Sequence, residues 1–518
     1  MARSTIDAGR RRLLGAAALP LLGAAGIAPL RAAPRFTAYP FPLGVASGDP
    51  SSTGIVLWTR LAPQPLLPDG GMPHAAVEIG WEIAEDERFK RGLMHGRAIA
   101  FAELGHTVHV EVEGLQSGRD YFYRFTLDDE RSAVGRARTL PAPGALQPVR
   151  LGVVGCQRYE YAHFHALADL ARDAPDFVYC YGDFIYEYRS ALRAQDPGRV
   201  ARELPIAVDE CVSLDDYRLR YAIYRLDTNL QAAARCAPWI ASYDDHEVEN
   251  GWIADLKQDE RPSEVLLLRR AAALQAWYEN QPVRRSALPR GPDLRAYRRF
   301  EVGGLMRFST LDTRLFRSGR FCDGKLTSAC SPADADARHT MLGAAQEAWL
   351  ADGLKERAAP VWTVLAQQIL MAQAHAVPKS DKWDRTPLAR QRLMDLLADS
   401  RAPNPIVLSG DLHYGVAADL KRDWRNLESP TVGSEILGYA VGSTAPSGAS
   451  DAFFATLKQE NPHIKLASRE RGWTRHTVDT KRWRAEFRAV AEPMRAESAV
   501  ETVAAVSVEA GRPGLRVE

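Results

Sequence analysis

Four short clusters of polar residues each follow a run of apolar, strand-forming residues. They lie at residues 155–157 (GCQ), 181–187 (YGDFIYE), 243–250 (YDDHEVEN) and 409–413 (SGDLH). In an open α/β sheet, ligands bind beyond the carboxyl ends of the strands, so clusters at four strand ends can converge on one site. The four clusters therefore predict one joint site built from potential ligands.

Each cluster taken alone also has an ordinary structural explanation. A Gly-Asp pair after a strand is usually a turn, and a single buried cysteine usually packs as a small apolar residue. In the third cluster an aspartate could cap a helix. All four clusters occur at predicted strand ends in one chain, and this combination favours a joint site over four separate turns.

The segment at 149–500 has the pattern of a layered α/β domain. Apolar runs at 150–155, 176–181, 239–243, 361–365 and 405–409 predict buried strands. Amphipathic stretches lie between them, such as residues 342–350. Strands that alternate with helices are typical of a layered α/β architecture. From Asp451 onward, an amphipathic helix and a lid over the site remain alternatives to ordinary core packing.

Residues 36–140 have a different pattern, with short alternating or aromatic-rich runs. These runs lie at 54–59, 75–81, 106–112 and 121–125, and Gly, Pro and Asp residues separate them. Several short strands at this spacing predict an all-β sandwich of the immunoglobulin or fibronectin type. The stretch at 141–144 (PAPG) then reads as the linker to the second domain.

Residues 1–33 have the order of an export signal. Arg10, Arg11 and Arg12 precede an apolar run that reaches Ile27, and small residues follow at 32–33. The run is shorter than the roughly 20 residues that a membrane-spanning helix needs. We predict a signal peptide of the twin-arginine type, which is exported by the twin-arginine translocase, and a periplasmic or secreted protein. A general secretory signal and an uncleaved anchor are the alternatives.

The overall composition is that of a soluble globular protein. Hydrophobic residues make up 46% and charged residues 25%, and the formal net charge is +1. This balance gives no nucleic-acid-binding signature. The six cysteines form an even count, which permits disulfides in an exported protein. Cys322 and Cys330 flank a turn-rich stretch and are the best candidate pair, although sequence alone does not establish the bond.

The motifs resemble those of the alkaline phosphatase D (PhoD-like) family of the metallophosphoesterase superfamily. The resemblance covers the four clusters and extends from Phe41 to about residue 480. Further matching stretches are 43–50 (LGVASGDP), 57–60 (LWTR), 311–314 (LDTR), 341–344 (MLGA), 346–350 (QEAWL), 461–463 (NPH) and 471–472 (RG). The resemblance implies a metallophosphatase β-sandwich core flanked by helices, ferric iron (Fe3+) and calcium (Ca2+) as cofactors, and hydrolysis of phosphoric esters.

The resemblance also implies a set of metal ligands. A thiolate suits iron better than a hard alkaline-earth ion, and oxygen-only coordination suits calcium. Gln368 competes with Gln367 for one position, and Asp244 competes with Asp245 for another. The predicted metal ligands are Cys156, Asp183, Tyr186, Asp245, Gln367, Asp411 and His413.

Two further residues are predicted to act on the substrate. A hydroxide ion formed between the metals would attack phosphorus in line. His246 would protonate the leaving oxygen, or it would only orient a carboxylate. Arg314 would contact a phosphate oxygen, with a surface or helix-capping role as the alternative.

The ligand set does not decide between phosphate monoesters and diesters. A phosphatase with phosphodiesterase capacity is the first hypothesis, and a phospholipase D-type enzyme that acts on phospholipids is the second. We expect a monomer. A non-catalytic scaffold is disfavoured because no ligand is missing from the motifs. A nucleophilic role for Cys156 is disfavoured because residues 157–159 (QRY) lack a glycine-rich phosphate cradle.

Overall fold

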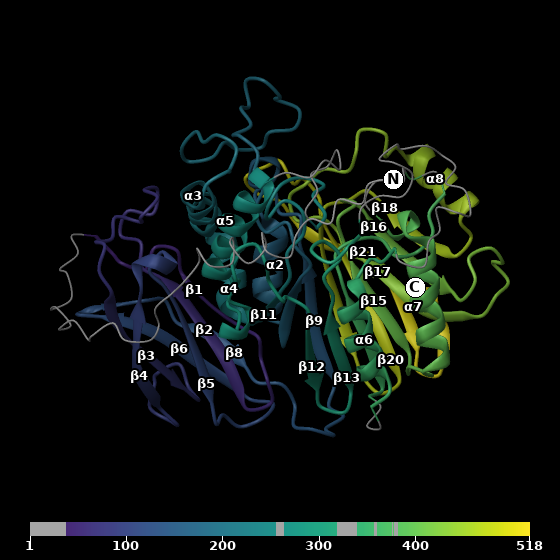
Figure 1. The fold of residues 1–518 in the computed structure, drawn as a ribbon, viewed down its shortest axis with the longest axis horizontal. Coiled ribbons are helices and arrows are strands. Elements are labelled where there is room, and N and C mark those ends of the chain that lie inside the picture. Colours follow the sequence, from purple (N-terminus) through teal and green to yellow (C-terminus); the bar gives the residue numbers. More distant parts are fainter. Residues whose placement is uncertain (1–37, 255–263, 319–338, 357–359, 376, 378–381) are drawn as a thin grey trace, which may run out of the picture.

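The fold is taken from a computed structural model. It describes residues 38–254, 264–318, 339–356, 360–375, 377 and 382–518 (Figure 1). The predicted signal peptide and the candidate pair Cys322 and Cys330 lie outside these ranges. Cys156, Cys180 and Cys211 are buried free thiols. Within the described ranges, no helix combines the length and the apolar character that crossing a membrane requires.

Two large sheets form the centre of the molecule (Figure 1). The first has ten strands in the order β22-β21-β20-β19-β9-β10-β11-β1-β2-β5, and the second has seven in the order β12-β13-β14-β15-β17-β16-β18. The strands of the first sheet are β1 (Val45–Gly48), β2 (Gly54–Arg60), β5 (Thr107–Glu113), β9 (Val149–Val154), β10 (Phe177–Cys180), β11 (Pro238–Ala241), β19 (Gly472–Val478), β20 (Arg482–Val490), β21 (Val500–Glu509) and β22 (Arg512–Val517). The strands of the second are β12 (Arg298–Val302), β13 (Met306–Thr310), β14 (Trp362–Ala366), β15 (Pro405–Ser409), β16 (Gly415–Lys421), β17 (Thr431–Leu437) and β18 (Ile464–Ser468).

The central strands β9, β10 and β11 are parallel and, apart from the exposed Arg150 of β9, buried. Phe177 is paired with Leu151, and Val178 is paired with both Gly152 and Trp239. Strands β13, β14 and β15 are parallel in the second sheet. Parallel strands that are covered on both faces read as continuous apolar runs, which is why β9, β10, β11, β14 and β15 were predicted from the sequence, whereas β13 was not.

Helices cover the outer faces of both sheets. They are α2 (His165–Asp173), α3 (Leu214–Arg225), α4 (Thr228–Cys236), α5 (Glu264–Asn280), α6 (Gly343–Leu354), α7 (Pro387–Asp399) and α8 (Asp451–Glu460). Side chains of α2–α5 pack in one apolar cluster with strands of the first sheet, and side chains of α6–α8 pack with the second. A third cluster fills the space between the sheets, where Phe177 and Tyr179 meet Phe308 edge-on. The result is the predicted metallophosphatase β-sandwich flanked by helices.

The predicted all-β N-terminal domain is present. A sheet of β3 (Val77–Ala84), β4 (Met94–Ala100), β6 (Asp120–Leu127), β7 (Glu130–Arg131) and β8 (Gly135–Arg138) packs on β1, β2 and β5 around one apolar cluster. Strand β1 also pairs in parallel with β11, through Ser47 with Pro238 and Gly48 with Trp239. The two halves of the chain therefore share a continuous sheet, and the domain limits at 36–140 and 149–500 stay predictions.

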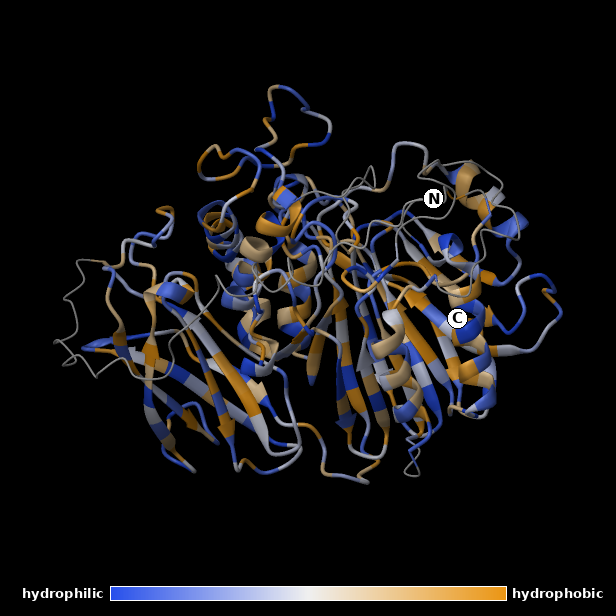
Figure 2. Ribbon diagram, in the orientation of Figure 1, coloured by the Kyte–Doolittle hydropathy of each residue, from blue (hydrophilic) through white to orange (hydrophobic). Residues whose placement is uncertain are grey.

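The C-terminal segment contributes strands that the sequence analysis did not identify. Helix α8 begins where an amphipathic helix was considered, and Ser450 caps it by accepting the N–H of Phe453. Strands β19–β22 then extend the first sheet, with Thr474 paired to Val153. The sheet continues past residue 500 and ends with Val517. Figure 2 shows hydrophobic residues recurring along the strands of both central sheets.

Candidate metal centre

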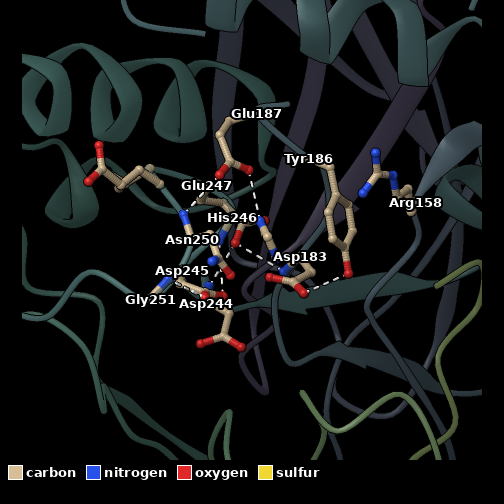
Figure 3. A network of polar contacts seen from close by, with 12 residues as sticks. Arg158, Asp183, Tyr186, Glu187, Asp244, Asp245, His246, Glu247, Asn250 and Gly251 are labelled. Carbon is tan, nitrogen blue, oxygen red and sulfur yellow. Dashed lines mark hydrogen bonds and ion pairs between the residues drawn. The ribbon is translucent and has the colours of Figure 1, made fainter. Parts of the chain in front are cut away.

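The four polar clusters meet at the carboxyl ends of β9, β10 and β11 in one sheet and of β15 in the other. Figure 3 shows the residues that follow β10 and β11, among them Asp183, Asp245 and His246. Within each of three groups, the possible ligand atoms all lie within 4.8 Å of one another. These groups are Cys156, Asp183 and His413; Asp183, Asp245 and His246; and Asp244, Asp245 and Asp411. Asp183 and Asp245 each belong to two groups, so the three form one continuous centre.

A single tyrosine ring holds the two sheets in register beneath this centre. The Tyr181 ring lies against Gly155 of the first sheet and Gly410 of the second, and a Cβ atom on either glycine would overlap the ring. Its hydroxyl donates to the Tyr439 carbonyl at 3.0 Å. The two glycines thus allow the loops that carry Cys156 and Asp411 to approach each other.

Four of the predicted ligands have left-handed backbone conformations. The φ angles are 48° for Cys156, 53° for Asp183, 70° for Asp411 and 60° for His413. Such angles are unusual for residues other than glycine, and they concentrate at functional sites where the surrounding structure enforces them. The backbone is therefore bent at the points where these side chains enter the centre.

One half of the centre is built around Asp183 and Tyr186. The Tyr186 hydroxyl donates to Asp183 Oδ2 at 2.8 Å and lies 3.1 Å from His413 Nε2. The Cys156 thiol lies 3.3 Å from the same Asp183 oxygen. Ser443 donates its hydroxyl to Tyr186 Oη at 2.5 Å. A thiol, a phenol, an imidazole and a carboxylate therefore face one point.

The other half consists of carboxylates gathered around Arg314. The guanidinium contacts Asp244 Oδ1 and lies 3.5 Å from Asp245 Oδ1 and 3.6 Å from Asp411 Oδ1. Arg314 is fully buried, which removes the surface alternative. These contacts favour a role in holding the carboxylates together.

His246 stands between the two halves and is oriented by Glu187. Its Nδ1 lies 2.8 Å from Glu187 Oε2, and the other oxygen of Glu187 accepts the Asn250 N–H at 2.8 Å. The imidazole also packs on the Tyr186 ring, with 4.2 Å between centroids. With Nδ1 held by Glu187, Nε2 is the nitrogen that can serve the centre.

Glu247 ties two of the strand ends together from below. Its carboxylate accepts the backbone N–H groups of Asp183 at 3.0 Å, Phe184 at 2.6 Å and Asp244 at 2.7 Å. Burial and the nearby Asp183 raise the pKa of Glu247 to about 8, although these donors oppose the shift. Glu247 thus fixes the loops after β10 and β11 relative to each other.

The two candidate glutamines at the end of β14 are both engaged in local hydrogen bonds. The Gln367 side-chain oxygen accepts the Ile369 N–H at 3.2 Å and the Trp383 indole N–H at 3.3 Å. The Gln368 oxygen accepts from the backbone and the hydroxyl of Thr313 at 3.1 and 2.6 Å. The competition between them for a ligand position stays open.

The electrostatics of the centre fit the presence of cations. Burial and the adjacent carboxylates raise the pKa of the Cys156 thiol well above its usual value. Burial alone would raise the pKa of Asp183, but His246, His413 and Tyr186 lower it to about 2. Burial and the neighbouring aspartates raise the pKa of Asp244, against the opposing effect of Arg314. Closely packed anions of this kind are stable when a cation lies among them.

Two buried oxygens support the same conclusion. Within the described part of the chain, Asp183 Oδ1 and Asp244 Oδ2 have no hydrogen-bond partner. A buried carboxylate oxygen without a partner costs free energy unless an ion or water contacts it. The raised pKa also keeps the Cys156 thiol protonated in the absence of metal, which does not support a cysteine nucleophile. The residues therefore fit metal ions.

Some residues of the centre were not assigned a role from the sequence. Glu187 and Glu247 lie within the recognised clusters, so their position beside predicted ligands was a usable signal. Ser443 and Thr444 follow β17, and no motif marks them. The Thr444 carbonyl lies 3.1 Å from His413 Nδ1 and so orients that imidazole.

The chain matches one protein family in comparisons with known proteins. The model of the PhoD-like phosphatase family matches residues 151–487, and the model of its N-terminal domain matches 27–141. Alkaline phosphatase D of Bacillus subtilis (strain 168) is 39% identical over 508 residues, which cover 96% of this chain and 86% of that protein.

Two solved structures resemble the fold. A structure of PhoD superposes with a TM-score of 0.87 at 38% identity, covering 94% of this chain and 93% of that one. The purple acid phosphatase PPD1 from yellow lupin seeds gives a TM-score of 0.57 at 12% identity, covering 90% and 74%. The second likeness concerns the fold alone.

Proposed function

The chain belongs to the PhoD-like phosphatase family and is a phosphoric ester hydrolase, and from this premise we propose that it is an exported, metal-dependent alkaline phosphatase with phosphodiesterase capacity. One observation carries the metal dependence. Thiol, imidazole and carboxylate groups converge within 4.8 Å in overlapping groups, Asp183 belongs to two of them, and the Tyr186 phenol lies 2.8 Å from Asp183 Oδ2. Such a mixed set is suited to two different ions.

The ligands divide into a softer and a harder half. Cys156, Tyr186 and His413 would hold ferric iron, because thiolate, phenolate and imidazole suit that ion. Asp245 and Asp411 would hold calcium, with Asp244 or Gln367 completing an oxygen-only pocket. Asp183 would bridge the two halves. When bound, the cations supply positive charge that acidifies water and neutralises the phosphate oxygens.

Side chains of the protein itself would transfer a proton and leave a path by which substrate reaches the centre. Glu187 holds His246 through Nδ1, so Nε2 is available to give a proton to the leaving oxygen of the ester. Arg314 keeps three carboxylates in place, and a direct contact with a phosphate oxygen stays part of the proposal. The side chains of His413 and Asp411 are 23% and 16% exposed, so substrate enters on their side.

The proposal extends to substrate and location. Phosphate monoesters and diesters are the substrates, and phospholipids are the diesters that a phospholipase D-type enzyme would take. Export by the twin-arginine translocase would carry the folded, metal-loaded monomer to the periplasm or the medium. In that order of events the iron is inserted in the cytoplasm.

Removal of calcium tests the metal dependence. A calcium chelator is expected to lower the hydrolysis of an aryl phosphomonoester and an aryl phosphodiester together, on the order of 10²-fold for the ~3 kcal/mol of transition-state stabilisation that a cation supplies. Added calcium should restore both rates, and chelator saturated with calcium is the control. Rates that survive prolonged chelation would contradict the proposal. Hydrolysis of phospholipid vesicles that is faster than hydrolysis of the aryl phosphodiester would favour the phospholipase alternative.

A further inference from the structure

Three arginines from distant parts of the chain gather around Tyr161 at the edge of the centre, two against its ring and one at its backbone carbonyl. The Arg158 guanidinium lies 4.3 Å from the ring centroid, and that of Arg199 lies 4.6 Å from it. Arg471 donates to the Tyr161 carbonyl at 2.6 Å. Arg158 follows β9, Arg199 lies between β10 and α3, and Arg471 precedes β19. We call these three residues the arginine cluster.

The arginine cluster adjoins the metal centre through Arg158. Its guanidinium lies 4.9 Å from the Tyr188 ring centroid and 5.6 Å from that of Tyr186, and Figure 3 shows it beside Tyr186. The His246 ring contacts both tyrosines, with centroids 4.2 Å from Tyr186 and 5.1 Å from Tyr188. The tyrosine pair therefore separates the proposed proton donor from Arg158, with His246 on one side and the guanidinium on the other.

The other two arginines adjoin the centre through the segment 442–444. Arg199 Nε donates to Thr444 Oγ1 at 3.0 Å, and the carbonyl of Thr444 faces His413 Nδ1. Arg471 donates to the Gly442 carbonyl at 3.2 Å. Because Ser443 between them bonds to Tyr186, the arginine cluster and the metal centre share one wall.

The cluster has an excess of positive charge. Arg158 has Glu160 as its acidic partner at a distance of 3.8 Å. Among the described residues, neither Arg199 nor Arg471 forms an ion pair. The Nε of Arg158 is buried and has no hydrogen-bond partner there. Burial and the proximity of Arg199 lower the pKa of Arg471 to about 10. Arg158 and Arg471 are partly buried and Arg199 is exposed, and clustered like charges are stabilised when an anion binds between them.

We propose that Arg158, Arg199 and Arg471 form a second anion-binding subsite, which takes a phosphate group attached to the leaving-group side of the substrate. This inference rests on the proposed function, since the leaving group departs where His246 can protonate it. The tyrosine pair lies between His246 and Arg158, and Tyr188 is the partly exposed member, so a leaving group that passes Tyr188 reaches the guanidinium. Phosphate is the expected anion, because guanidinium groups match phosphate oxygens with paired hydrogen bonds.

A matched pair of substrates tests the subsite. The probes are an alkanediol bisphosphate and the alkanediol monophosphate of the same length. The wild-type enzyme is expected to have a KM for the bisphosphate roughly tenfold below that for the monophosphate, the ratio that one charge-assisted hydrogen bond gives. Arg199→Gln should remove most of this preference and Arg199→Glu should reverse it, with the preference taken in each variant as the ratio of its two KM values. Added salt should weaken the preference as well.

Arg91→Gln is the matched control, because its side chain is 72% exposed in the N-terminal domain and the charge change is the same. Equal KM values in the wild type, or the same preference in wild type and Arg199→Gln, would overturn the subsite while leaving the proposed function intact. If the wild type hydrolyses neither probe, the proposed function fails instead. Calorimetric binding of the bisphosphate then tests the subsite separately, because the subsite requires that the wild type bind the bisphosphate more tightly than Arg199→Gln does.

Discussion

Replacing Asp183 by asparagine is expected to lower kcat/KM for an aryl phosphomonoester on the order of 10³-fold, for a loss of ~4 kcal/mol of transition-state stabilisation. The reason is the position of its carboxylate. Asp183 shares one group of ligand atoms with Cys156 and His413 and another with Asp245 and His246. Asparagine keeps the size of the side chain but lacks the charge that two cations would share.

The same substitution should leave the fold in place. The backbone N–H of Asp183 is held by Glu247, and this bond does not involve the substituted side chain. Thermal unfolding and metal content of the variant are therefore measured beside the kinetics. Asp419→Asn is the control, because Asp419 is also buried but belongs to none of the three ligand groups and accepts the Leu515 N–H at 2.8 Å. Retention of metal and of wild-type kcat/KM in Asp183→Asn would refute its bridging position.

His246→Gln should produce the second large effect, and its size should depend on the leaving group. For an alkyl phosphate, whose leaving oxygen needs a proton, we expect kcat to fall about 10²- to 10⁴-fold, the usual contribution of general acid catalysis. For an aryl ester with an acidic phenol, the loss should be much smaller. Steady-state kinetics on a series of esters of graded leaving-group pKa measures this difference.

Glu187→Gln separates proton donation from orientation. Glu187 is a positioning residue, since it acts through His246 Nδ1 at 2.8 Å. Its replacement should give the same dependence on the leaving group with a smaller amplitude. If both variants lose the same factor on every ester, His246 only orients a carboxylate, which is the alternative that the sequence left open.

The convergence of the candidate ligands was predictable because they follow buried parallel strands. Such strands read as uninterrupted apolar runs, and the residues after them project from one edge of the sheet. Asp183 follows β10, and Asp411 follows β15 in the opposite sheet, yet both reach the same centre. Their convergence depends on sheet-to-sheet packing around Tyr181, which a linear pattern does not encode.

The parts that were missed have specific physical reasons. Strands β19 and β20 carry charged residues on the face toward α2, where Arg475 and Arg488 pair with Asp173 and Asp169 at 2.9 and 2.8 Å. These charges obscured the strand pattern. Ser443 and Thr444 reach the centre by loop geometry alone, without a local motif. The pairing of β1 with β11 joins residues far apart in sequence, so no local signal predicts the shared sheet.

Metal analysis combined with visible absorption tests the central claim, that the chain holds iron through Tyr186 next to calcium. The mature protein, exported by its own signal, is compared with Tyr186→Phe. We expect bound iron and calcium in the wild type, a phenolate-to-iron charge-transfer band, and loss of that band in the variant, which lacks only the oxygen that lies 2.8 Å from Asp183 Oδ2. A colourless, iron-free protein, or a band that persists in Tyr186→Phe, would contradict this assignment.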